Sequence, residues 1–396
     1  MRIAWVTRSF LDYRIPVFRE LDRLVNGGLH LFFSGDYVPA RVIEKARQVL
    51  GNRAVPLKGE WRMGPEDRDF MANRNISIRF QPGLLRKIRS VSPEVLVGDG
   101  FFKWTLPALA YRLRYNVPLV ICYERWSHTE RSAQWYRTLY RKMVIRFTGA
   151  MCCNGVLSRQ YAAELGMPVE RITTGHMAAD TQGLALQVLS INTDQKNALR
   201  EKYNAMGIIY LFAGRLVPLK GLEQLLDAWA VFESQSLSGT LLIAGDGPLD
   251  QPLQERVKQK ELKRVRFAGP VPYADMAAYY ASADVLVIPT LEDNWSLVVP
   301  EAMACGLPIL CSKYNGCWPE LVHENENGWI FDPLDTCNTF QSLHKAYAGA
   351  IKLPEMGQRS REIVSGHSPL MAAESILLSC KTAFGRNMAD SPSDFI

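Results

Sequence analysis

Two carboxylates, Asp293 and Glu301, lie in a segment that has the groups needed to bind an activated sugar. Asp293 falls in a polar loop after the apolar run 285–288, which is typical of a buried strand. Ser296 is a residue type that caps helices, and Gly306 is one that ends them. We therefore expect Asp293 just before a helix and Glu301 about one turn inside it.

The backbone between these two carboxylates offers a second kind of group. Amide groups in the first turn of a helix have no acceptor within the helix, and the positive end of the helix dipole attracts phosphate. A phosphate-binding site between two carboxylates, each able to accept hydrogen bonds from sugar hydroxyls, suits a nucleotide sugar. An acidic loop before an ordinary amphipathic helix has the same pattern, so this segment alone leaves both interpretations open.

Further chemical groups follow other apolar runs in the C-terminal half. Gly214, Arg215 and Lys220 follow one run, and Gly245 follows the next along the chain. Glycine lets the backbone approach a ligand closely, and two cations can hold a diphosphate. Open parallel sheets bind ligands at the carboxyl ends of their strands, so these segments are predicted to form one site.

Taken together, these segments resemble the retaining GT-B glycosyltransferases called family 4, or glycosyl transferases group 1. The resemblance is strong over residues 209–332 and weak in the N-terminal half. It implies an α/β fold with two Rossmann-like open parallel-sheet domains facing across a cleft. The expected parts are an acceptor-binding domain at 1–190, a nucleotide-sugar-binding domain at 191–366, and a crossover helix that returns to the first domain, with a tail, at 367–396.

The resemblance also implies roles for single residues. Arg215 and Lys220 would hold the donor diphosphate, and Glu301 would bind the ribose. Asp293 occupies the place of the first glutamate in the family's Glu-x7-Glu motif, which contacts the transferred sugar. Because this residue is Asp and its neighbour is Glu292, either carboxylate could face the sugar, and the spacing favours Asp293. The residues expected at the donor are Gly214, Arg215, Lys220, Gly245, Asn294, Trp295, Ser296, Leu297, Val298 and Glu301.

Candidate catalytic groups in the N-terminal half are Glu124 and His128. Many family members have a histidine after the strand that corresponds to 118–122, and here Glu124 takes that place, with His128 four residues on. A carboxylate there can stabilise positive charge on the sugar. Glu124 could equally be a structural partner of Arg125 or Arg131.

Candidate acceptor-binding groups follow two other strands of that half. Asp99 lies between two glycines at a predicted strand end and could bind an acceptor hydroxyl. Arg8 and Arg14 lie in the loop where many relatives have a glycine pair, and either could contact a phosphate of donor or acceptor. An arginine near a helix start is also often a simple surface charge.

The chemistry of glycosyl transfer needs no cofactor beyond the donor. Negative charge develops on the leaving diphosphate, and the basic pair can stabilise it without a metal. No Asp-x-Asp signature follows a predicted strand, and the eight cysteines match no usual zinc spacing. The resemblance implies retention and a UDP- or GDP-linked donor. No carboxylate is evidently placed as a nucleophile for a double displacement.

The bulk composition is that of a globular protein with two domains. The chain has 396 residues, of which 47% are hydrophobic and 22% are charged. No apolar run is long enough to span a bilayer, and Arg8, Asp12 and Arg14 interrupt the start too early for a secretory signal. We expect a cytoplasmic protein.

The charge is divided unequally between the two halves. Residues 1–190 contain 28 basic and 16 acidic residues, a net charge of +12, whereas the remainder has a net charge of −6. A basic half suggests an anionic partner, such as a membrane surface or a lipid-linked diphosphate acceptor. The segment 79–89 could be a basic amphipathic stretch on the inner membrane face, or a helix that packs its apolar side inward. No nucleic-acid-binding motif accompanies the charge, so nucleic acid is not an expected partner.

Two other functions are compatible with this pattern. A nucleotide-sugar epimerase of similar build would need acid and base groups on both sides of the sugar. A non-catalytic GT-B subunit could have lost the chemistry, as the change to Asp293 and the missing glycine pair allow. Soluble saccharides remain possible acceptors beside lipid-linked ones.

The coarse pattern of elements agrees with alternating strands and helices, and the region 36–75 is expected to be mostly exposed loops with a short helix. The predicted strands of the N-terminal half are 3–6, 29–33, 94–98, 118–122 and 150–153, and the predicted helices are 15–25, 104–114 and 132–146.

Overall fold

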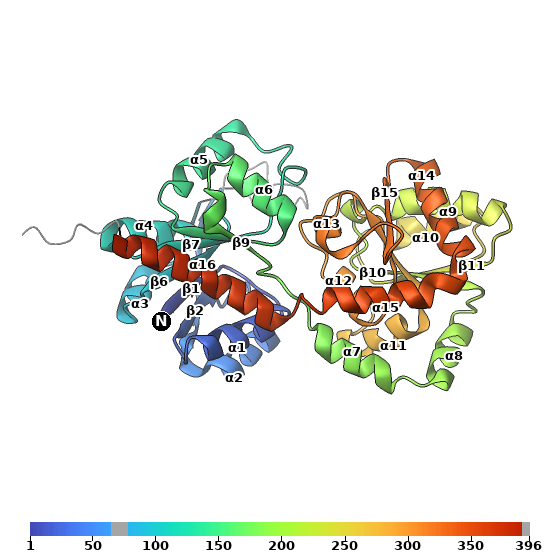
Figure 1. Cartoon of the computed structure of the whole chain (residues 1–396), viewed down its shortest axis with the longest axis horizontal. Coiled ribbons are helices and arrows are strands. Elements are labelled where there is room, and N and C mark those ends of the chain that lie inside the picture. Colours follow the sequence, from blue (N-terminus) through green and yellow to red (C-terminus); the bar gives the residue numbers. More distant parts are fainter. Residues whose placement is uncertain (65–77, 390–396) are drawn as a thin grey trace, which may run out of the picture. The chain divides into compact units, whose positions relative to one another are not determined.

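Two parallel sheets, each covered by helices, make up the part of the chain that the computed structural model describes, residues 1–64 and 78–389 (Figure 1). The chain forms two compact units. The first contains Met1–Ala178 together with helix α16 (Pro369–Ala389), and the second is Ala179–Ser368. The expected fold class, two Rossmann-like open parallel sheets, is confirmed.

The first unit has a seven-stranded sheet in the order β3-β2-β1-β6-β7-β8-β9, and every neighbouring pair is parallel. A separate antiparallel hairpin joins β4 and β5. The strands are β1 (Ile3–Val6), β2 (Leu29–Ser34), β3 (Ala54–Leu57), β4 (Trp61–Met63), β5 (Ile78–Phe80), β6 (Val95–Asp99), β7 (Leu119–Tyr123), β8 (Ala150–Cys153) and β9 (Ile172–Thr174). The helices are α1 (Arg14–Leu24), α2 (Ala40–Leu50), α3 (Leu84–Ser90), α4 (Thr105–Tyr115), α5 (Trp135–Ile145) and α6 (Val156–Glu164).

Helices cover both faces of this sheet, because side chains alternate along each strand. Trp5 and Leu31 point to the face covered by α1, α2 and α16. Ala4 and Phe32 point to the other face, which is covered by α3, α4, α5 and α6. The strands are therefore apolar on both sides, as parallel sheets require.

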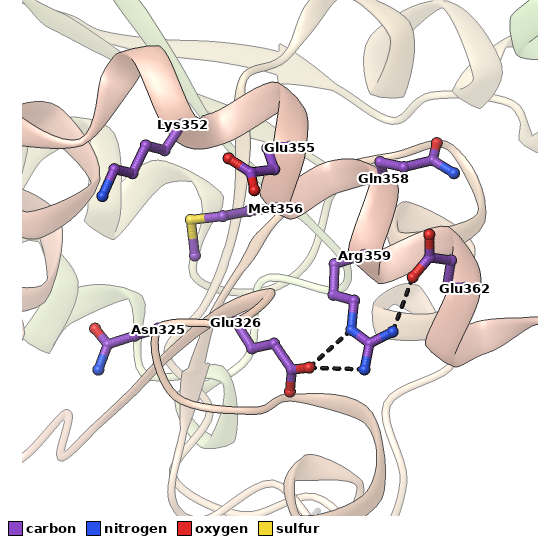
Figure 2. Close-up of a pocket in the computed structure, with 8 residues that line it drawn as sticks. All are labelled: Asn325, Glu326, Lys352, Glu355, Met356, Gln358, Arg359 and Glu362. Carbon is purple, nitrogen blue, oxygen red and sulfur yellow. Dashed lines mark hydrogen bonds and ion pairs between the residues drawn. The ribbon is translucent and has the colours of Figure 1, made fainter.

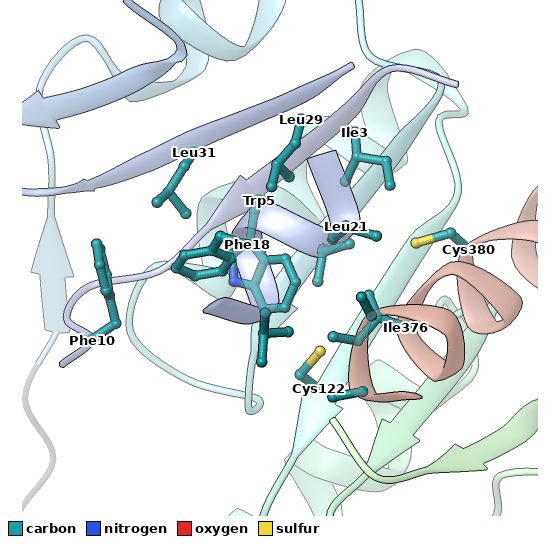
Figure 3. Close-up of a cluster of buried hydrophobic side chains, with 14 of the residues drawn as sticks. Ile3, Trp5, Phe10, Phe18, Leu21, Leu29, Leu31, Cys122, Ile376 and Cys380 are labelled. Atoms are coloured by element: carbon teal, nitrogen blue, oxygen red, sulfur yellow. The ribbon is translucent and has the colours of Figure 1, made fainter. Parts of the chain in front are cut away.

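The C-terminal helix α16 completes the first core although it follows the second unit in sequence. It packs against α1 and strands β6–β9. Ile376 and Cys380 are fully buried beside Leu21 and Cys122 (Figure 3). The expectation that the last helix returns to the first domain is confirmed.

The second unit has a six-stranded parallel sheet in the order β12-β11-β10-β13-β14-β15. Its strands are β10 (Ile208–Ala213), β11 (Gly239–Ala244), β12 (Val265–Gly269), β13 (Val285–Ile288), β14 (Ile309–Ser312) and β15 (Gly328–Phe331). Its helices are α7 (Thr181–Ser190), α8 (Thr193–Lys202), α9 (Leu222–Ser234), α10 (Asp250–Gln259), α11 (Met276–Ser282), α12 (Val298–Ala304), α13 (Trp318–Leu321), α14 (Thr336–Ala348) and α15 (Leu353–Val364).

The boundary between the units lies earlier than residue 190. Helix α7 packs against α11 and α12, with Leu184 buried, so residues 179–190 group with the second unit. The polar residues after position 190 instead mark the start of α8, where Asn192 and Gln195 form a capping box.

The region 36–75 is more ordered than expected. Within it lie the eleven-residue helix α2 and the strands β3 and β4, while positions 65–75 lie outside the described residues. Val42, Ala46 and Leu50 recur every four residues and are buried, whereas Arg41 and Lys45 face solvent. The exposed cations of one helix face account for the polar composition that suggested loops.

The segment 79–89 does not form one amphipathic surface. Arg79 is buried beside Glu60, and helix α3 turns Leu84 and Ile88 into the core, so only Phe80 and Leu85 among its expected apolar residues are exposed. Of the two interpretations above, the helix that packs its apolar side inward agrees with this burial.

Candidate functional site

Each sheet has one position where the winding of the chain reverses, and the candidate residues gather there. In the first sheet the reversal lies between β1 and β6, and in the second between β10 and β13. Loops that leave neighbouring strands in opposite directions leave a crevice at the carboxyl ends, which is where open α/β sheets bind ligands. Arg14 and Asp99 follow the first pair of strands, and Lys220 and Asp293 follow the second.

The glycines of the second unit hold two loops against each other. The Gly214 amide donates to the Ala244 carbonyl at 3.0 Å, and the Leu216 amide donates to the Asp246 carbonyl at 2.7 Å, so pairing continues beyond β10 and β11. A Cβ on Gly245 would lie 1.8 Å from the Gly214 oxygen, and its φ of +148° disfavours other residues. Gly245 is therefore required for the close approach of the two loops, and Gly214, with a φ of +151°, has a backbone conformation that other residues rarely adopt.

Lys220 and Asp293 form an ion pair at the same edge, with 2.5 Å between Nζ and Oδ2. The Asp293 carboxylate also accepts hydrogen bonds from the Ser296 hydroxyl at 2.9 Å and from the Trp295 amide at 3.1 Å. It thus fixes the turn before α12 and holds the lysine in place. The side chain of Arg215 is exposed at the start of the same loop.

The start of α12 differs from the expected cap. The cap residue is Leu297, with no side-chain cap bond, and the Ser296 hydroxyl binds Asp293 instead. The Ser296 amide lies 3.4 Å from the Asn315 side-chain oxygen, so it is not fully available. Among the described residues, the amides of Leu297 and Val298 have no acceptor. The expected phosphate-binding site therefore has fewer available amide groups than the sequence indicated.

Glu301 lies in α12, about one turn inside the helix as expected, and is partly buried. Burial raises its pKa to about 7, nearby Asp180 acts in the same direction, and a hydrogen bond from the Tyr280 hydroxyl at 2.9 Å opposes them. Tyr280 is itself buried in α11 and was not predicted from the sequence. The carboxyl group is consequently poised between its two protonation states near neutral pH.

In the first unit, one buried arginine draws two candidate carboxylates together. Arg14 is 3% exposed, and its Nη2 lies 3.3 Å from the Glu124 carboxylate and 3.7 Å from that of Asp99. The Trp5 indole donates to the other Asp99 oxygen at 3.3 Å. Burial disfavours the guanidinium charge, but the neighbouring carboxylates outweigh it and raise the pKa of Arg14. The structure thus brings together three of the predicted residues.

His176 is a further member of this cluster that the sequence analysis missed. Its Nδ1 lies 3.1 Å from Arg14 Nη1, and its Nε2 lies 3.3 Å from the Tyr123 carbonyl. Because a guanidinium only donates, Nδ1 accepts and Nε2 carries the proton. Burial and the Arg14 charge lower the pKa of His176 well below its usual value, so the ring is neutral. His176 lies two residues after β9, and this position at a strand end is the sequence feature that could have marked it as a candidate site residue.

The other candidates of this unit have different surroundings. The His128 ring lies 5.2 Å from the Trp126 ring in the loop after β7, and its catalytic role stays a prediction. Arg8 binds the buried Glu60 at 2.9 Å and covers the Tyr37 ring at 3.4 Å. Arg8 is therefore held by its own partners rather than presented to a phosphate.

A pocket of about 440 Å³ lies elsewhere, on the second unit (Figure 2). Its loop, with Asn325 and Glu326, enters β15, so it lies at the amino ends of the strands, away from the edge that carries Lys220. Arg359 in this pocket binds Glu326 at 2.7 Å and Glu362 at 2.8 Å. Arg359 is thus engaged by two carboxylates of the pocket itself, and we do not assign the site to this pocket.

Residues 1–64 and 78–389 contain neither a metal-binding cluster nor a membrane-spanning helix. No group of three or more His, Cys, Asp or Glu side chains there is placed to hold a metal ion. None of the helices in the same ranges combines the length and the apolar character needed to cross a membrane.

The chain thus has two Rossmann-like domains, each with charged side chains at the carboxyl ends of its parallel strands. Residues 194–362 match the family model described as Glycosyl transferases group 1. This match covers less than half of the chain and contains every candidate donor residue.

Two relatives and one solved structure resemble this chain. The chain is 32% identical over 160 residues to D-inositol 3-phosphate glycosyltransferase of Jonesia denitrificans, and the alignment covers 38% of each chain. It is 24% identical over 275 residues to alpha-monoglucosyldiacylglycerol synthase of Acholeplasma laidlawii, covering 64% of this chain and 67% of that one. Anabaena Alr3699/HepE in complex with UDP shares the fold, with a TM-score of 0.72, 15% identity, and coverage of 96% and 100%.

Removal of the buried cation should destabilise the first unit. We expect Arg14→Met to cost about 3 kcal/mol, because Glu124, Asp99 and His176 Nδ1 lose their shared donor. The matched control is Arg41→Met, which breaks an exposed pair with Asp12 and should cost under about 1 kcal/mol. Urea unfolding followed by circular dichroism measures both, and equal losses would contradict a special role for Arg14.

Proposed function

We propose that this protein is a retaining glycosyltransferase that moves a hexosyl group from a nucleotide sugar to an acceptor. The observation that supports this most is the edge formed by Lys220, Asp293 and Glu301 at the reversal point of the second sheet, in the part of the chain that matches the group 1 family model. A UDP-linked donor is the first choice, because the structural neighbour from Anabaena was solved with UDP and with UDP-glucose.

Different residues of the second unit bind different parts of the donor. Arg215 and Lys220 bind the diphosphate and stabilise its charge as it leaves. Glu301 accepts hydrogen bonds from the ribose hydroxyls. Asp293 contacts the transferred sugar and positions Lys220, to which it is already bound. Transfer proceeds with retention by attack on the face that the diphosphate leaves, with the leaving phosphate as the base.

The acceptor binds to the first unit. Asp99 and Glu124 present partly exposed carboxylates, with 27% and 37% of their side chains accessible, and Arg14 orients both. A lipid-linked saccharide or glycolipid suits the basic N-terminal half, as in surface polysaccharide or glycolipid assembly on the inner face of the cell membrane. The Acholeplasma relative is, by its name, a glycolipid synthase.

A non-catalytic GT-B subunit and a nucleotide-sugar epimerase are the alternative functions. The ion pair between Lys220 and Asp293 favours transfer, since a subunit without a donor would not need a cation at this edge. A subunit that binds no nucleotide sugar would be recognised by the first experiment below, and an epimerase would convert its donor in the absence of any acceptor.

Donor binding should be detectable as thermal stabilisation. We expect one member of a panel of UDP-, GDP-, ADP- and CMP-sugars to add about 2.7 kcal/mol at a hundred times its Kd. Lys220→Ala should abolish the shift. Loss of its ion pair with Asp293, whose side chain is 15% exposed, should also lower the melting temperature of the free variant, so the shift is measured relative to each protein without ligand.

The matched control for this experiment is Lys258→Ala, which removes an exposed lysine of α10 in the same unit. This variant should keep the full ligand shift. No shift with any nucleotide sugar at millimolar concentration would contradict the proposed function.

The affinity for the donor should depend on the ionisation of Glu301. Its pKa is about 7 without ligand, and the ionised form accepts hydrogen bonds from a ribose, so binding should favour proton release. Below about pH 6 the affinity should fall about tenfold per pH unit, and above about pH 8 it should be constant. Calorimetry with a UDP-sugar, whose diphosphate does not titrate in this range, measures this, and an equal slope in Glu301→Gln would contradict it.

Donor binding should not require a divalent cation, because Arg215 and Lys220 supply the positive charge. We expect the Kd for the nucleotide sugar to be the same in excess EDTA and in magnesium, by the same calorimetric assay. A Kd more than ten times higher in EDTA, restored by magnesium or manganese, would contradict this expectation.

A further inference from the structure

Helix α5 exposes a stripe of large apolar side chains on its outer face. Trp135, Leu139 and Met143 are 77%, 60% and 49% exposed, and Phe147, just after the helix, is 41% exposed. Residues four apart lie on one side of a helix, so these side chains form one continuous strip. Isolated exposed apolar residues are ordinary, but an aligned set that includes Trp and Phe marks an interaction surface.

Positive charges accompany this apolar strip. Lys142 and Arg146 are exposed and, within residues 1–64 and 78–389, make no ion pair, and Arg131 is exposed just before the helix. The sequence contains no Asp or Glu between Glu130 and Glu164. The surface is therefore apolar and cationic without local acidic compensation.

The exposure of this strip does not come from a loosely packed helix. Val144 and Ile145 on the opposite side are buried in the first core. Arg141 on that side binds Glu130 at 2.6 Å, and both residues are buried. The inner face fixes α5 to the unit, so the outer apolar residues are not needed for folding.

The inner face of α5 also contacts the loop that carries an acceptor candidate. The Tyr140 hydroxyl donates to the Phe101 carbonyl at 3.0 Å, and the Tyr140 ring stacks on Phe102 at 5.0 Å. Asp99 begins this same loop at the end of β6. Whatever binds the outer face of α5 is thereby held close to the Asp99 edge of the same unit.

We propose that the outer face of α5 adsorbs to the surface of an anionic lipid bilayer. Trp and Phe favour the region between headgroups and acyl chains, and Lys and Arg favour anionic headgroups. The net charge of +12 in residues 1–190 supplies the long-range attraction. The exposed cations of α3, including Arg86 and Lys87, add charge, but the buried Leu84 and Ile88 leave the apolar contact to α5.

This inference rests on the proposed function and makes it more specific, because a membrane-bound protein would take its acceptor from the membrane. A bilayer bound at α5 brings lipid headgroups to the unit that carries Asp99 and Glu124. Adsorption itself requires neither donor nor catalysis, so it can be tested separately from activity.

The test is flotation of the full chain with vesicles of phosphatidylglycerol and phosphatidylcholine, compared with vesicles of phosphatidylcholine alone. We expect at least tenfold tighter binding to the anionic vesicles. The triple variant Trp135→Ser, Leu139→Ser, Met143→Ser should lose at least tenfold of this affinity, and so should Lys142→Glu with Arg146→Glu.

Matched controls come from the second unit, where α7 exposes Leu186 and Leu189 by 69% and 80%. Leu186→Ser with Leu189→Ser, and Lys258→Glu with Lys352→Glu, should bind vesicles like the unchanged protein. Unchanged melting temperatures of the α5 variants verify their folding, and an unchanged thermal shift with the nucleotide sugar verifies their donor site.

Several results would overturn the proposal. Equal binding to both kinds of vesicle, absence of binding, or equal losses in the control variants would each do so. Self-association seen by light scattering and lost in the triple variant, without vesicle binding, would assign the surface to a second copy. If vesicles bind but no nucleotide sugar does, the proposed function fails and the lipid surface stands.

Discussion

Parallel pairing of the strands is the constraint on which the candidate sites depend. Because every neighbouring pair in both large sheets is parallel, all strands of a sheet end at one edge. The strand order then reverses once in each sheet, and two loops that leave in opposite directions cannot close over the edge between them. Arg14 and Asp99 in one unit, and Lys220 and Asp293 in the other, occupy these openings.

Close backbone contact gives the second edge its shape. Gly245 lies against the Gly214 carbonyl, and a Cβ on Gly221 would lie 2.0 Å from the Pro289 carbonyl, so the loops after β10, β11 and β13 touch through main-chain atoms. A side chain at any of these points would push the loops apart and separate Lys220 from Asp293. The ion pair is therefore a consequence of glycine placement as much as of charge.

The sequence predicts the helices and strands better than it predicts which side chains contact one another. Strong local signals, such as the apolar run 285–288 and the Asn192 capping residue, correspond to β13 and the start of α8. The partnership of Arg14 with His176 joins residues 162 positions apart, and no local pattern specifies it. Ser296 is a helix-capping residue type, yet its hydroxyl donates a hydrogen bond to the Asp293 carboxylate instead of capping α12. Helix-capping propensity does not predict this tertiary contact.

The two cations differ in what they can do for a ligand. Arg14 is buried and shares its guanidinium among His176, Glu124 and Asp99, so contact with an acceptor phosphate would require breaking several buried bonds. Its geometry favours orientation of the two carboxylates. Lys220 is 22% exposed, and its ammonium has three donors, so it can contact a diphosphate while it remains paired with Asp293. For the proposed transfer, the fixed cation of the first unit suits orientation of acceptor-binding carboxylates, and the accessible cation of the second unit suits a leaving group that gains charge.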